Sequence, residues 1–175
     1  FLAVVGFLLV LPITGTRLLD LYINIRTDSS VTRYSSLPNY TNIEWVEQYF
    51  KDQEALQTRY SDFVTWIPEP LNTQTINIDE YGRRDSILPE HVGTDQIWLF
   101  GGSTMWGMGV DDANTIPSYL ATQTATMAVN FGVNGYVSRQ DIGRLLQAYT
   151  ESSSDNSARR TIVFYGGVND ALYSC

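Results

Sequence analysis

Three polar, glycine-containing blocks of the sequence together hold the groups needed to attack an acyl carbonyl. The blocks are residues 101–104, which contain Ser103, residues 130–135, which end at Gly135, and residues 167–170, which contain Asn169. A serine hydroxyl becomes a nucleophile when a base takes its proton. The oxyanion formed by the attack needs donors aimed at it, and the backbone N–H groups of Ser103 and Gly135 and the side-chain amide of Asn169 are the candidates. These three residues are therefore the predicted catalytic set.

The apolar runs before these blocks predict buried parallel strands at Ile97–Phe100, Ala128–Phe131 and Thr161–Tyr165. They are short and continuous, as expected of strands buried on both faces. Apolar residues at helical spacing predict helices between them, near Thr115–Gln123 and Arg139–Glu151. This alternation predicts an α/β fold in which helices cover both faces of a parallel sheet. Functional sites of such sheets gather beyond the carboxyl ends of the strands, where all three blocks fall.

The first 26 residues are predicted to form a transmembrane anchor helix. Phe1–Gly15 carries no charge, but it is shorter than the roughly 20 residues that span a bilayer, and the sequence starts inside the apolar run. Thr16–Ile25 mixes apolar residues with Arg17 and Asp20, which fits a helix leaving the bilayer through the headgroup zone. A cleaved signal peptide and a buried soluble helix are the alternatives, and the lack of an Ala-x-Ala-like site favours the retained anchor. We expect membrane lipid as its partner and the remaining chain on the periplasmic or extracytoplasmic side.

Residues 27–95 are predicted to be a linker and a lead-in segment. Thr27–Tyr40 is rich in Ser, Thr, Asn and Pro, which is typical of a linker. Thr41–Glu44 matches a capping box, so we expect a helix that runs to about Gln57. Alternation predicts a short strand at Thr75–Ile78 and a turn follows at Tyr81–Arg84. The strand–helix alternation begins at residue 96, which makes residues 96–175 the start of the catalytic-type domain.

Composition limits the partners of the chain. A net charge of −8 disfavours binding to nucleic acid, whose phosphates recruit Lys and Arg. Cys175 is the only cysteine, so there is no intrachain disulfide and no site built from several cysteines. His91 is the only histidine, which excludes a metal site with several histidines. We expect neither a metal nor a cofactor.

The order of the blocks resembles that of the SGNH, or GDSL-type, hydrolase superfamily over roughly residues 96–170. Each block alone is typical of an ordinary turn after a strand, and their joint occurrence carries the resemblance. It implies a three-layer α/β/α sandwich in which Ser103 is the nucleophile and Gly135 and Asn169 help to bind the oxyanion. The common Gly-Asp-Ser is Gly101-Gly102-Ser103 here, a variant of membrane-attached members, and the two glycines permit a tight turn. Residues 60–84 also look like the segment before this domain in anchored bacterial members.

The catalytic base is the larger departure from this superfamily. The family takes Asp and His from a late Asp-x-x-His block, and this sequence contains no such spacing. His91 precedes Ser103 and is interpreted as a surface-loop residue rather than as the base. We expect either that the sequence is part of a longer polypeptide, which supplies the base beyond Cys175, or that catalysis is lost.

Two functions follow from these expectations. The first is a membrane-anchored, extracytoplasmic serine esterase or acyltransferase of the SGNH type, acting on an ester such as an acetylated glycan. The alternative is a catalytically idle accessory or structural subunit of a larger membrane protein complex, whose other subunits would be its partners.

Overall fold

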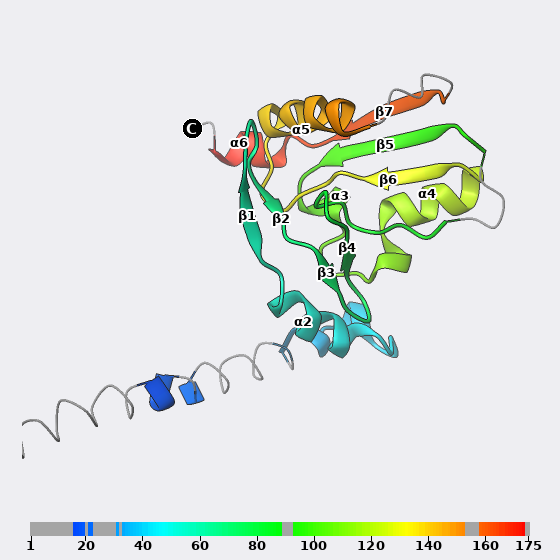
Figure 1. Ribbon diagram of the computed structural model, residues 1–175. Helices are drawn as coiled ribbons and strands as arrows, with labels where there is room; N and C mark the ends of the chain where they lie inside the picture. The colour runs from blue at the N-terminus through cyan, green and yellow to red at the C-terminus, as the bar shows by residue number, and fades with distance from the viewer. Residues whose placement is uncertain are drawn as a thin grey trace, which may run out of the picture.

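A three-stranded parallel sheet forms the centre of the computed structural model, which describes residues 16–19, 21–22, 31, 33–88, 93–152 and 158–173 (Figure 1). Its strands are β5 (Gln96–Gly101), β6 (Met127–Asn130) and β7 (Arg160–Tyr165), in the order β6-β5-β7. Both neighbours pair with β5 in parallel, so the earliest of these strands lies in the middle. The order 2-1-3 is that of the first strands of a flavodoxin-like sheet, with its switch point between β5 and β7.

Helices cover both faces of this sheet. The side chains of β5 point alternately to the two faces and pack there in two separate cores. Trp98 and Phe100 pack in one core with Ala148 of α5, whereas Leu99 packs in the other core with Ala121 of α4. Figure 1 shows these two helices along opposite sides of the sheet. The helices are, in chain order, α2 (Val46–Glu54), α3 (Ser103–Trp106), α4 (Ile116–Thr124), α5 (Ser138–Glu151) and α6 (Val168–Tyr173), with 3-10 turns η1 (Pro38–Tyr40) and η2 (Asp112–Asn114). The predicted α/β class is confirmed.

The predicted strands and helices of this region agree with the structure to within one or two residues at each end. The helix expected from Thr115 begins at Ile116, because Thr115 is its N-cap. The Thr115 hydroxyl accepts a hydrogen bond from the Ser118 backbone N–H at 3.3 Å. A side-chain oxygen at this position satisfies a donor that the first turn of a helix leaves free.

Two short hairpins precede the sheet. The first pairs β1 (Thr58–Ser61) with β2 (Thr65–Pro68), and the second pairs β3 (Leu71–Asn72) with β4 (Asn77–Ile78). The second hairpin includes part of the strand predicted at Thr75–Ile78, but the first was not predicted. Single antiparallel bridges link Ile78 to Arg84 and Arg84 to Asn130, so the lead-in segment is joined to β6.

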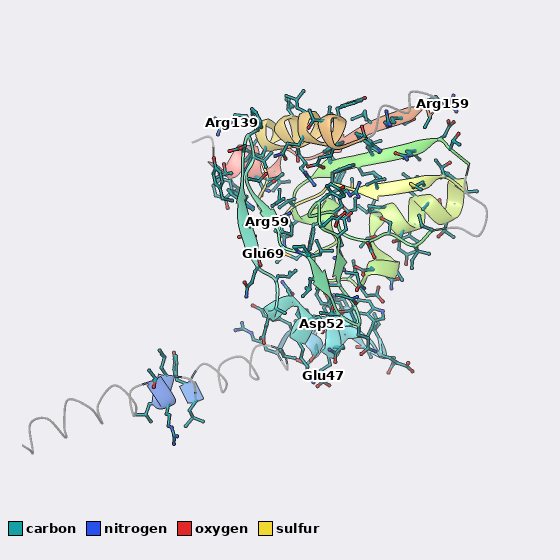
Figure 2. All side chains as sticks on the ribbon, viewed as in Figure 1. Glu47, Asp52, Arg59, Glu69, Arg139 and Arg159 are labelled. Carbon is teal, nitrogen blue, oxygen red and sulfur yellow. The ribbon has the colours of Figure 1, made fainter. Side chains whose placement is uncertain are left out.

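Helix α2 begins later than its predicted capping box. The Thr41 hydroxyl donates to the Pro38 carbonyl oxygen, and Asn42 has a left-handed φ of 63°. The capping-box prediction is therefore wrong, because these residues form a turn instead of the first helical turn. Asp52, labelled on α2 in Figure 2, ties the helix to the second hairpin: its carboxylate accepts from the backbone N–H and the hydroxyl of Thr75 at 3.0 and 2.7 Å.

The predicted membrane anchor falls mostly outside the described residues. Residues 16–19 and 21–22 are helical, but Phe1–Gly15 is not described. Over the part of the chain that the structure covers, no helix has the length and apolar character needed to cross a bilayer.

Replacing Gly132 with alanine is expected to destabilise the protein by about 2–3 kcal/mol, because the added methyl group has no room. A Cβ at Gly132 would lie 2.5 Å from the Trp106 backbone nitrogen and 2.8 Å from the Met105 carbonyl carbon. Both are backbone atoms, so the loop after β6 and helix α3 would have to separate. Urea unfolding of Gly132→Ala measures the cost, and Gly93→Ala is the control, since among the described residues no atom beyond its chain neighbours lies within 4 Å of its Cβ. Equal stability of the two variants would contradict the predicted close approach.

Candidate functional site

Ser103 sits on a tight turn at the carboxyl end of the central strand. It opens α3, a helix of only four residues, and its carbonyl oxygen accepts from the backbone N–H groups of Gly107 and Met108 at 3.1 and 2.9 Å. Gly107 ends this turn with a φ of 90°, a left-handed conformation that favours glycine. Two hydrogen bonds thus connect residues 107–108 directly to the backbone of Ser103.

A cavity of about 220 Å³ opens beside Ser103. It is lined by residues 102–104 after β5, by Tyr136 after β6 and by residues 165–169 after β7. It therefore lies between the carboxyl ends of β5 and β7, where the strand order reverses. Open α/β sheets bind ligands at this switch point. Residues of the first and third predicted blocks line this cavity, together with Tyr136, which directly follows the second block.

Asn169 is held over the turn before Ser103. Its Nδ2 donates to the Tyr136 carbonyl oxygen at 2.8 Å. A Cβ added at Gly102 would lie 2.7 Å from this Nδ2 and 3.5 Å from the same carbonyl oxygen. Gly102, in the first block, therefore lies close both to Asn169 of the third block and to Tyr136, the residue that follows the second block. An amide nitrogen carries two hydrogens, so after one is given to Tyr136 the second is the candidate donor to an oxyanion.

Gly135 lies next to the cavity but is not among the residues that line it. It has a φ of 82° and precedes Tyr136, which does line the cavity. The structure thus brings Ser103 and Asn169 to one cavity and places Gly135 one residue outside its wall. The backbone N–H of Gly135 remains a predicted donor.

Tyr136 connects the second block to the β1–β2 hairpin. Its hydroxyl donates to the Trp66 carbonyl oxygen, and the two rings pack edge to face with centroids 5.7 Å apart. Burial raises the pKa of Tyr136, which keeps this hydroxyl protonated as a donor. Tyr136 was not among the predicted site residues. Its position directly after Gly135 was the one feature of the sequence that could have indicated a place beside the site.

Asp170 joins the third block to the start of α5. Its carboxylate accepts from the backbone N–H and the hydroxyl of Ser138, each at 3.0 Å. A carboxylate is stabilised at the N-terminus of a helix, where free N–H groups and the helix dipole both favour negative charge. This contact fixes α6, and with it the neighbouring Asn169, against the N-terminus of α5.

Asp141 is a buried carboxylic acid beside the same wall. It is 3% exposed and lines a second cavity of about 320 Å³, which shares Gly166 and Gly167 with the Ser103 cavity. Within the described ranges, its Oδ1 has no hydrogen-bond partner. Burial, and to a lesser extent the charge of Asp170, raises the pKa of Asp141 to about 6. The neutral acid is therefore the form that the fold favours.

Stability is expected to fall as pH rises from about 4 to 7, because Asp141 must then ionise while buried. Its folded pKa lies above its unfolded value, so the stabilisation is present below pH 4 and is lost as pH passes through 6. Asp141→Asn removes this ionisation. The stability of wild type relative to this variant should therefore drop by about 2 kcal/mol across the range, as urea unfolding at several pH values would show. A constant difference would contradict the raised pKa.

The catalytic base is not among the residues around Ser103. The described residues that line the cavity include no histidine and no carboxylate, and His91 lies outside the described residues. Nor does any group of three or more His, Cys, Asp or Glu in the described ranges form a cluster suited to a metal ion. The cavity presents the Ser103 hydroxyl and the Asn169 amide, which are the predicted nucleophile and a predicted donor.

Comparison with known proteins adds no family assignment. No protein-family model matches the chain, and no curated protein matches it significantly. The likeness to SGNH hydrolases therefore rests on the three blocks and remains a hypothesis.

Proposed function

We propose that this chain belongs to a serine esterase or acyltransferase of the SGNH type. The observation that carries this proposal is that Ser103 and Asn169, which are far apart in the sequence, line one cavity at the switch point of a parallel sheet. Gly102, between them, has no side chain and lets the Asn169 amide approach the turn that carries Ser103. A nucleophile and an amide donor on one cavity wall suit acyl transfer.

The proposed reaction begins when the Ser103 Oγ attacks the carbonyl carbon of an ester. The carbonyl electron pair moves to oxygen, and the oxyanion accepts from the Ser103 N–H, the Gly135 N–H and the second Asn169 amide hydrogen. Expulsion of the protonated alcohol leaves an acyl-serine, which water cleaves in an esterase and an acceptor hydroxyl cleaves in an acyltransferase. The reaction also requires a histidine oriented by an aspartate to take and return the proton, and the described residues that line the cavity include neither.

The proposed substrate is an ester with a small, neutral acyl group, such as an acetyl group on a glycan. Two features support this choice. The cavity is smaller than the roughly 300 Å³ at which drug-sized ligand sites begin, and the residues that line it carry no charge.

The proposed location is the extracytoplasmic face of a membrane, with residues 1–26 as the anchor. The apolar side chains described in this segment are each more than half exposed, and they are Leu18, Leu19, Leu21 and Tyr22. Their exposure to solvent is unfavourable, and burial in lipid would remove it.

A fluorophosphonate probe tests the nucleophile, because it forms a covalent bond with an activated serine. The full-length wild-type protein is expected to take up one label per chain on Ser103, found by mass spectrometry of the digested protein. Ser103→Ala should take up none, and Ser36→Ala, which changes an exposed serine outside the cavity, should label as wild type does. Labelling of Ser103→Ala at the wild-type level would contradict the proposal.

An idle subunit of a membrane complex is the second candidate, and the exposed apolar surface near the third block favours it. The large apolar side chains of β7 and α6 are about half exposed or more, and they are Phe164, Tyr165, Val168, Leu172 and Tyr173. Monomeric proteins rarely expose a large contiguous apolar patch. A folded wild-type protein that neither labels nor cleaves esters would favour this candidate.

A further inference from the structure

We propose that Arg84, with Tyr40 and Tyr49, forms a clamp that positions Ser103 by holding the loop at residues 106–110. None of these three residues lies in the blocks that carry the predicted chemistry. The inference rests on the proposed function, since it assigns positioning residues to the Ser103 nucleophile.

Arg84 provides the centre of the clamp. Its side chain is fully buried, and its Nη1 donates to the carbonyl oxygens of Trp106 and Gly107 at 3.1 and 2.8 Å. Its Nη2 donates to the Val110 carbonyl oxygen at 2.7 Å and reaches that of Thr75 at 3.4 Å. One guanidinium therefore holds three carbonyl groups of the loop that follows α3.

The charge of Arg84 is balanced by a single carboxylate. Its Nε donates to Oδ1 of Asp112 at 2.7 Å, and Oδ2 of Asp112 accepts from the backbone N–H of Asn77 at 2.8 Å. A buried charge is tolerated only when it is paired and hydrogen-bonded, and here all three guanidinium nitrogens have partners. Asp112 thus connects Arg84 both to η2, which contains Asp112, and to β4, which contains Asn77.

Tyr40 and Tyr49 grip the same loop at Gly109. The Tyr49 hydroxyl oxygen accepts from the Gly109 backbone N–H at 2.7 Å, and the Tyr40 hydroxyl donates to the Gly109 carbonyl oxygen at 2.8 Å. The backbone N–H and the carbonyl group of Gly109 are therefore both hydrogen-bonded to tyrosines. Each of these tyrosines lies more than forty residues before the first strand of the parallel sheet.

The loop transmits this hold to Ser103 through two hydrogen bonds. The Gly107 and Met108 N–H groups both donate to the Ser103 carbonyl oxygen, so the loop and the nucleophile turn move together. On the other side, Asn130 Nδ2 donates to the Trp106 carbonyl oxygen at 3.3 Å. Because small displacements of a reacting group carry a large rate penalty, loosening this loop should slow the chemical step rather than substrate binding.

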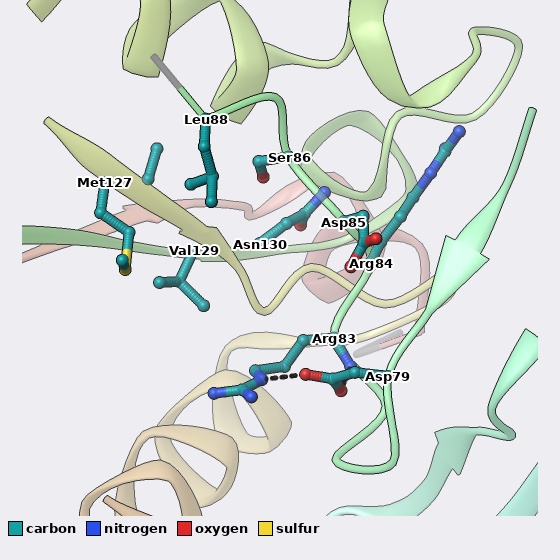
Figure 3. Close-up of a pocket in the computed structure, with 10 residues that line it drawn as sticks. Asp79, Arg83, Arg84, Asp85, Ser86, Leu88, Met127, Val129 and Asn130 are labelled. Atoms are coloured by element: carbon teal, nitrogen blue, oxygen red, sulfur yellow. Dashed lines mark hydrogen bonds and ion pairs between the residues drawn. The ribbon is translucent and has the colours of Figure 1, made fainter. Parts of the chain in front are cut away.

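The adjacent Arg83 provides a matched control. It is about one third exposed and pairs with Asp79 at 2.6 Å, and among the described residues its side chain makes no hydrogen bond to the loop at residues 106–110. Figure 3 shows the two arginine side chains pointing in different directions, with the Arg83–Asp79 pair beside the cavity at β6. Lysine at either position keeps the charge but replaces a planar fork of five donors with a single ammonium group.

The test compares wild type, Arg84→Lys, Arg83→Lys and Tyr40→Phe in the full-length protein. Melting temperature establishes folding, and the readouts are kcat and KM for p-nitrophenyl acetate and the rate of fluorophosphonate labelling. Arg84→Lys is expected to lower kcat and the labelling rate about 10- to 100-fold with KM within about twofold. Arg83→Lys should match wild type. Tyr40→Phe should lower kcat about threefold, since one of several loop contacts is lost.

Each outcome decides between the inference and the function on which it rests. A folded Arg84→Lys variant with wild-type kcat would overturn the clamp while leaving Ser103 as the nucleophile. If Arg84→Lys does not fold, an unchanged kcat in Tyr40→Phe overturns the clamp and a lowered one supports it. A wild-type protein that neither labels nor turns over ester would instead overturn the proposed function, and the clamp with it.

Discussion

Replacing Ser103 with alanine is expected to lower ester turnover by the full-length protein by roughly 10,000-fold or more. Alanine removes the only hydroxyl that the proposal assigns to covalent attack, and it leaves the cavity and the Asn169 amide in place. The measurement is kcat/KM for p-nitrophenyl acetate. The residual rate then reports what the oxyanion donors and binding contribute without a nucleophile.

The variant should remain folded, because the structural contacts of Ser103 are made by its backbone. Its carbonyl oxygen accepts from Gly107 and Met108, and alanine keeps this carbonyl. Ser36→Ala provides the matched control, since Ser36 is exposed and bonds only locally to the Arg33 carbonyl oxygen. Turnover by Ser103→Ala within tenfold of wild type would mean that another group attacks the ester.

The sheet could be predicted from the sequence because its residues obey local rules. The strand before Ser103 is apolar at each of positions 97–100. Its side chains alternate between the two faces of the sheet, so Trp98 packs in one core and Leu99 in the other. Thr115 is also a local signal, since a hydroxyl before a helical pattern marks an N-cap. Such features need no knowledge of distant segments, and this is why the β5–α4–β6–α5–β7 order was predictable.

The connections between the lead-in segment and the sheet could not be predicted in the same way. Arg84 occupies a Tyr-Gly-Arg-Arg stretch that reads as a polar turn, and the sequence does not distinguish it from Arg83. One arginine is fully buried and the other about one third exposed. The difference arises from carbonyl groups that lie more than twenty residues away, which only the folded chain brings together.

The structural reason why position 102 requires glycine also differs from the reason inferred from the sequence. Two glycines before a nucleophile suggest a backbone that other residues cannot adopt; this holds for Gly101, which has a φ of 157°, whereas Gly102 has a φ of −81°. What requires glycine is space, because the Asn169 amide and the Tyr136 carbonyl occupy the position of a side chain. The requirement is therefore tertiary, and it links the first block to the other two.

Replacing Gly102 with alanine is accordingly expected to lower kcat about 100- to 1,000-fold, which is the typical effect of losing one oxyanion donor. The methyl group would lie 2.7 Å from Asn169 Nδ2, so the amide must move away from the Tyr136 carbonyl oxygen that orients it. The obstructing atom belongs to a side chain, which can move, and the φ of −81° at Gly102 is one that alanine adopts, while its ψ of −150° lies outside the usual β region and adds some strain. The fold should therefore survive while the donor is displaced.

Three further variants make this prediction specific. Asn169→Ala removes the same donor directly, so its kcat should fall by a similar factor, and the double variant should lose little beyond either single one. Gly93→Ala adds a methyl group where no described atom beyond the chain neighbours lies within 4 Å, and it should match wild type. Steady-state kinetics and melting temperatures of all four proteins provide the measurement. If the effects of Gly102→Ala and Asn169→Ala multiply in full, the methyl group acts on something other than the Asn169 amide, and the convergence of these two residues on one oxyanion would be wrong.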